Sequence, residues 1–131
     1  MGHQLKPHTG SLPPAREIAR RLAIEFAYVK ADEAEAIKEA NARADWIERA
    51  PSRIFFGRHQ EALNGAARLR KLMPGEALVI YFGDEQANST RISVIPGEPI
   101  NFGYGSGEEE ARLKSLVERC ARALDCDVVL F

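Results

Sequence analysis

The sequence predicts a mixed α/β protein of the two-layer α+β type. The predicted architecture is a βαββαβ split core with both core helices on one sheet face, preceded by an N-terminal helical hairpin. One observation is the order of patterns from residue 53 onwards, which runs strand, helix, strand, strand, helix, strand. Another is the unbroken apolar run ALVIYF at residues 77–82, which is typical of a strand covered on both faces. The third is a pair of amphipathic helical patterns before Pro51.

The chain is expected to contain one domain, residues 12–131, after a disordered tail, residues 1–11. Its 131 residues are a normal domain length, and 45% of them are hydrophobic and 28% charged, as in ordinary globular proteins. The first eleven, MGHQLKPHTGS, contain no apolar run, so neither ordered structure nor a signal peptide is expected there. His3 and His8 lie in this tail, and no metal role is predicted for them.

A helical hairpin is predicted over residues 14–49. Pro14 suits a first helical turn, where a missing N–H costs nothing, and the apolar stripe that follows predicts a helix over about residues 14–30. The second helix, about residues 33–49, begins after Asp32, whose side chain can cap it, and ends before a proline. The short joint between the two helices favours an antiparallel pair.

The core, residues 53–131, should contain four strands and two helices. Strands are expected at 53–57, 77–82, 90–95 and 127–131, helices at 59–73 and 107–124, and a short strand or irregular arm at 100–104. Because both crossovers are right-handed, the two helices should cover one face of the sheet. The other face is then left for the N-terminal hairpin or for a second subunit. The terminal strand, DVVLF, is expected inside the sheet, next to the 53–57 or 77–82 strand, since a free apolar edge promotes aggregation.

Residues 53–95 resemble part of a known family. Around RLRKLMPGEALVIYFGD, the helix, Pro-Gly-Glu turn and strand look like those of the TusA-like sulfur-carrier family, which shares the βαββαβ order. Members carry a reactive cysteine in a Cys-Pro motif at the start of the first core helix. This chain has FGRHQEA there, with Arg58 or His59 near the position of that cysteine. The resemblance therefore implies a local topology and no persulfide chemistry.

Charge and cysteine content restrict the partners. The formal net charge is −1, so the whole molecule has no net attraction to nucleic acid or to anionic membranes. No segment approaches the roughly 18 apolar residues of a membrane span. Cys120 and Cys126 match no zinc or redox spacing, and as reduced thiols they indicate a cytoplasmic location. No cofactor, metal or membrane partner is predicted.

The stretch NFGYGSGEEEAR, residues 101–112, places three alternate glycines before a helix, as phosphate-binding turns do. The glutamates at 108–110 would repel an anion there, whereas near a helix N-terminus they stabilise the helix itself. We therefore interpret the stretch as a flexible connection followed by a helix start.

A basic segment, residues 53–71, is the candidate nucleic-acid contact. Its cations lie beside Phe55 and Phe56, and single-stranded nucleic acid needs cations for its phosphates and rings for stacking. The candidate contacts are Arg53, Arg58, His59, Arg68, Arg70 and Lys71. The alternative is that cations in the last helical turn only stabilise the helix, and that the acidic helix 33–49 balances the segment.

The favoured function is a small intracellular, non-catalytic binding or protein-interaction module of unknown ligand, because no group of nucleophile, base and orienting residue emerges. An exposed apolar patch is expected at Trp46, Phe55, Phe56 and Phe102. Binding of RNA or single-stranded DNA through residues 53–71 is the first alternative, and a small enzyme using Arg58 and His59 is the second. The partner is left open between another protein, a second copy of the chain and, at lower weight, nucleic acid.

Overall fold

Six strands and four α-helices make up the part of the chain that the computed structural model describes, residues 2–85, 89–102 and 108–130. The strands are β1 (His3–Pro7), β2 (Tyr28–Asp32), β3 (Leu78–Gly83), β4 (Thr90–Val94), β5 (Ile100–Phe102) and β6 (Cys126–Leu130). The helices are α1 (Ala15–Glu25), α2 (Glu33–Arg49), α3 (His59–Arg70) and α4 (Glu108–Leu124), with a 3₁₀ turn, η1, at Ser52–Phe55. The predicted mixed α/β class is therefore confirmed.

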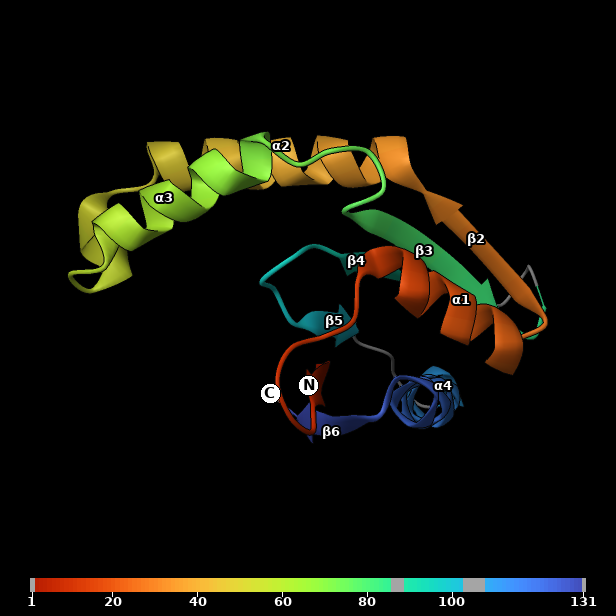
Figure 1. The fold of residues 1–131 in the computed structure, drawn as a ribbon. Helices are drawn as coiled ribbons and strands as arrows, with labels where there is room; N and C mark the ends of the chain where they lie inside the picture. The colour runs from red at the N-terminus through yellow and green to blue at the C-terminus, as the bar shows by residue number, and fades with distance from the viewer. Residues whose placement is uncertain (1, 86–88, 103–107, 131) are drawn as a thin grey trace.

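The strands form two antiparallel sheets of three strands each, in the orders β2-β3-β4 and β5-β1-β6. α1 and α4 pack against each other, and their buried faces join the buried side chains of both sheets in one main core (Figure 1). Phe82 links parts of this core, since its ring centroid lies 4.8 Å from that of Phe26 and 6.3 Å from that of Phe102. The two sheets therefore share one hydrophobic interior.

β3 is covered on both faces, as its apolar run predicts. Leu78, Ile80 and Phe82 belong to the main core, whereas Val79 belongs to a second core formed with α2 and α3. The prediction that both core helices lie on one sheet face is wrong, because α3 packs in the second core and α4 in the main one. That prediction assumed a crossover from a strand at 53–57, which the structure does not contain.

α2 and α3 lie side by side with opposite directions and extend away from the sheets (Figure 1). We call this pair the arm, and we call its far end, Trp46 and residues 50–59, the arm tip. The buried residues of α2 are all alanines, and they share the second core with Ala66 of α3. Small side chains at such positions let two helices approach closely. The arm is thus held by close backbone packing, with its base resting on β3.

The predicted N-terminal elements need two corrections. Residues 1–11 were expected to be a disordered tail, but they contain β1, the middle strand of its sheet. The predicted helix 14–30 ends at Glu25, and Tyr28–Asp32 instead pairs with β3 as β2. The helical hairpin is therefore not residues 14–49 but the α2–α3 arm. In both cases pairing with a distant strand overrides the local pattern.

Two further strand predictions are wrong in place or type. Residues 53–57 form most of a 3₁₀ turn and the reversal that follows it, so the βαββαβ order that the sulfur carriers share is not found. The local sequence of helix, turn and strand is present as α3 and β3. β3 has β2 on one side and β4 on the other, so no strand from this segment lies next to it. The terminal strand forms as β6, but it pairs with β1 at a sheet edge rather than with 53–57 or 77–82.

Candidate functional site

The arm tip is a tight chain reversal between α2 and α3. Pro51 begins it, and successive turns follow, in which Ile54 N donates to Pro51 O at 3.2 Å and Phe56 N donates to Arg53 O at 3.3 Å. Phe56 then adopts the left-handed conformation, with φ 50° and ψ 48°, and Gly57 continues the reversal with φ 82°. This conformation is rare and strained for a bulky residue, and such strain concentrates at functional sites.

Three aromatic rings pack on one another at the tip. Phe55 stacks on His59 with 5.4 Å between ring centroids, and Trp46 meets Phe55 edge-on at 6.3 Å. Trp46 nevertheless remains 59% exposed, and Ile54 beside it is also exposed. Phe56 is 92% exposed. Folding gains almost no burial from Phe56, so its exposure in a strained backbone favours a role in binding.

The exposed charge at the tip is basic. Arg53 forms no ion pair with any residue that the structure describes. Arg58 donates to the carboxylate of Glu61, with Nε 3.0 Å and Nη2 2.9 Å from Oε2. Both side chains of that pair are largely exposed, so solvent screens it and Arg58 can exchange Glu61 for another carboxylate. The tip therefore combines exposed aromatic surface with arginines.

Arg70 is a clamp within the arm. Its Nε and one Nη donate to the two carboxylate oxygens of Glu48 at 2.9 and 2.8 Å, and the same Nη donates to Asp45. These hydrogen bonds lower the pKa of both carboxyl groups. The acidic helix thus balances part of the basic segment inside the molecule, and Arg70 links the end of α3 to α2.

The six basic residues predicted to contact nucleic acid do not form one surface. Arg53, Arg58 and His59 belong to the arm tip, and Arg68, Arg70 and Lys71 belong to the opposite end of α3. His59 and Arg68, the nearest members of the two groups, lie nine positions apart on α3, about 14 Å along the helix axis. Of the predicted apolar patch, the structure brings Trp46 and Phe55 together and leaves Phe56 exposed beside them. Phe102 is wrong as a member of an exposed patch, because in β5 it points into the main core.

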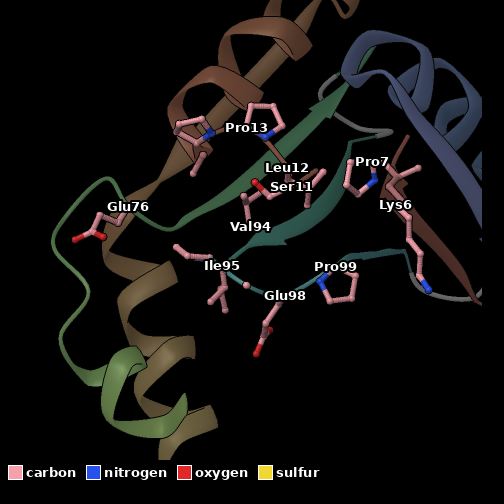
Figure 2. A pocket seen from close by; sticks show the side chains of 15 residues that line it. Lys6, Pro7, Ser11, Leu12, Pro13, Glu76, Val94, Ile95, Glu98 and Pro99 are labelled. Carbon is pink, nitrogen blue, oxygen red and sulfur yellow. The ribbon is translucent and has the colours of Figure 1, made fainter. Parts of the chain in front are cut away.

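Two cavities border the connection between β4 and β5. The first, of about 660 Å³, lies between this connection and the segment that joins β1 to α1. Its lining is largely apolar and includes Pro7, Pro13, Pro14, Pro96 and Pro99 (Figure 2). Figure 2 shows the carboxylates of Glu76 and Glu98 directed away from the middle of this space. The cavity is therefore suited to apolar rather than charged groups.

The second cavity, of about 590 Å³, lies between α3 and the same connection. Apolar residues of the arm line it together with Arg68 and Lys71, and Glu98 on its other side accepts a hydrogen bond from Arg43 at 2.8 Å. Arg58 and His59 line neither cavity. Both cavities were missed in the sequence analysis because each lining is assembled from segments far apart in the chain.

The remaining chemical groups are of low reactivity. Burial raises the pKa of the Cys120 thiol to about 12 and also raises that of Cys126. Thiols need a lowered pKa to act as nucleophiles at neutral pH. Among the described residues, no three potential ligands come together as a metal site, and no helix has the length and apolarity of a membrane span. Residues 103–107 of the glycine-rich stretch lie outside the described part of the chain.

Comparisons with protein-family models, with curated proteins and with solved structures find no match to this chain.

Proposed function

We propose that this protein is a non-catalytic interaction module that binds another protein through the arm tip. The observation that carries the proposal is Phe56, an almost fully exposed aromatic side chain in a left-handed backbone conformation. The preceding residue, Phe55, packs edge-on against the exposed Trp46, so further apolar surface lies at the same arm tip. Aromatic residues with arginine are the side chains that dominate the energetics of protein–protein contacts.

The charge at the tip defines the chemistry of the partner surface. Arg53 has no carboxylate partner in the described chain, and the pair formed by Arg58 is exposed. A partner with an apolar cleft for Phe56 and carboxylates around that cleft would satisfy both arginines. Such complementarity raises association rates and selects among partners. We therefore propose a cleft of this kind, apolar at its centre and acidic at its rim.

Nucleic acid is the second candidate, favoured by arginines beside exposed rings. Single-stranded nucleic acid binds along a continuous groove of cations that follows its backbone. Along α3, Arg70 is instead held by two carboxylates, and the remaining cations are split between the two ends of the helix. A compact protein contact at the tip fits this distribution better. We also infer a cytoplasmic location, since Cys120 and Cys126 are both free thiols.

Selection of a displayed library of random peptides on the intact protein tests the proposal. The selected peptides should combine aromatic or aliphatic residues with Asp or Glu. Labelled copies of the selected peptides are then titrated by fluorescence anisotropy against wild-type protein and variants. Phe56→Asp should weaken binding by roughly tenfold or more, which is the loss expected for a residue at the centre of an interface. Arg53→Glu should weaken it less and reduce its dependence on salt.

The matched control is Ile24→Asp, which places the same charge on another exposed apolar residue, 75% exposed on α1. It should leave binding unchanged. Peptides that bind Phe56→Asp as tightly as wild type, or a selected pool without acidic residues, would contradict the proposal. Tight binding of oligo(U) or oligo(dT) that Phe56→Asp abolishes would assign the tip to nucleic acid instead. Phe56-dependent binding to vesicles of anionic lipid would assign it to a membrane surface.

A further inference from the structure

β6 is an outer strand with two exposed apolar side chains on its core face. Within the described part of the chain it pairs with β1 alone. Val128 lies opposite Leu5, and Leu130 lies opposite His3, and both of these β1 residues are buried. Directly opposed residues point to the same face of a sheet, so the core face continues onto β6. There Leu130 is 58% exposed and Val128 is 36% exposed.

One of the two outer strands of the other sheet, β2, is protected against further pairing in a way that β6 is not. β2 carries the exposed Lys30 at its centre and runs directly into α2. Lysine at an edge is a common device against strand pairing. β6 contains neither lysine nor proline, and its one charged residue, Asp127, has its Oδ1 2.8 Å from His8 Nε2.

We propose that β6 pairs with β6 of a second copy of this chain, antiparallel and about a two-fold axis at Val128. The β5-β1-β6 sheet of each copy then becomes half of one sheet of six strands. Around this axis Val128 lies opposite its own symmetry mate, Cys126 opposite Leu130 of the second copy, and Asp127 opposite Val129. Apolar side chains therefore meet on the core face, and each aspartate faces a valine on the other.

This register is selected by charge and by length. The two-fold axis is perpendicular to the sheet and lies between the two strands. Opposed side chains share a face only if one residue lies directly opposite its own symmetry mate at this axis. An axis at Val128 pairs all five residues of β6. An axis at Asp127 would pair only three and would oppose the two aspartates, and directly opposed like charges are destabilising. An axis at Val129 would oppose no like charges but would again pair only three residues of β6. The Val128 register is therefore the one that pairs the whole strand without opposing like charges.

The contact is a narrow ribbon, smaller than the 1,200 Å² or so of a typical stable interface, so the dimer should dissociate on dilution. Sedimentation equilibrium over a series of concentrations measures its dissociation constant. Val128→Lys places two lysines opposite each other and should raise that constant by roughly tenfold or more. Ile24→Lys, at the exposed apolar site on α1, should leave it unchanged.

A cross-linking variant tests the register and keeps the proposal falsifiable if Val128→Lys does not fold. Val128→Cys brings two exposed thiols together at the axis, so mild oxidation should produce a covalent dimer, which Ile24→Cys should not form under the same conditions. A chain that stays monomeric at every concentration and does not cross-link overturns the proposal. So does a dimer that Val128→Lys leaves intact, or one that is lost in Phe56→Asp, since the arm tip and β6 are separate surfaces.

Discussion

Replacing Leu5 with alanine should destabilise the folded state by about 3 kcal/mol, within the range of about 2–5 kcal/mol measured for buried leucines. Leu5 is 0% exposed in the middle strand of its sheet, opposite Ile100 on one side and Val128 on the other. It belongs to the main core with α1 and α4, so the missing side chain would leave a cavity among rigid neighbours. Such a loss is a large fraction of the 5–15 kcal/mol or so that stabilises a typical domain.

Urea denaturation followed by far-ultraviolet circular dichroism measures this effect. With a slope of about 2 kcal/mol per molar urea, the midpoint should fall by about 1.5 M while the slope stays constant. Lys6→Ala is the control, because Lys6 is exposed in the same strand. This substitution should change the free energy of unfolding by about 0.5 kcal/mol or less. Equal midpoints for the two variants would refute the argument and would mean that residues 3–7 are a dispensable tail.

Two further predictions concern ion pairs that join separate elements. Arg119→Met should lower the free energy of unfolding by about 1–2 kcal/mol, and by less in high salt. The reason is that the guanidinium donates to Asp84 at 2.6 Å and lies 4.4 Å from the ring centroid of Phe26. An unchanged urea midpoint would show that these contacts contribute nothing to stability. The second prediction concerns His8, whose pKa is raised above 6.5 by its hydrogen bond to Asp125 and by the negative charge of Asp127. Its stabilisation is therefore complete below pH 6.5 and is lost as pH rises through the raised pKa, so wild type and His8→Gln should differ in urea midpoint at about pH 6 and converge at about pH 9. A His8 pKa at or below 6.5 in an NMR titration would contradict this.

Elements with a local signal were predictable from the sequence. α2 begins where the sequence places it, because the Asp32 carboxylate accepts a hydrogen bond from Glu35 N at 2.9 Å, three residues away. β3 was recognisable because a strand covered on both faces needs apolar side chains at every position. α4 lies where a helix was predicted, at 107–124, and Leu116 and Val117 are on its buried face. In each case the physical cause lies within one short segment.

Elements that depend on distant partners were not predictable. Leu5 becomes a core residue only because its strand pairs with the strands that contain Ile100 and Val128. The local sequence MGHQLKP contains no pattern that indicates this pairing. At the arm tip the aromatic residues were predicted but their geometry was not, since the sequence around Phe56 has the composition of a strand. It forms a turn instead, closed by hydrogen bonds after Pro51 and by the positive φ angles of Phe56 and Gly57. The site's residue types were thus readable, whereas its strained conformation was not.

The alanines that pack the arm and the residues that form its tip are separate sets. η1 contains no buried residue, whereas Ala36, Ala40 and Ala44 lie fully inside the second core. Substitutions at the tip therefore leave the packing of the arm almost untouched, and substitutions at the alanines would force the helices apart without altering the tip's chemistry. If the tip binds a partner as proposed, its specificity can therefore change by mutation at little cost to the stability of the arm.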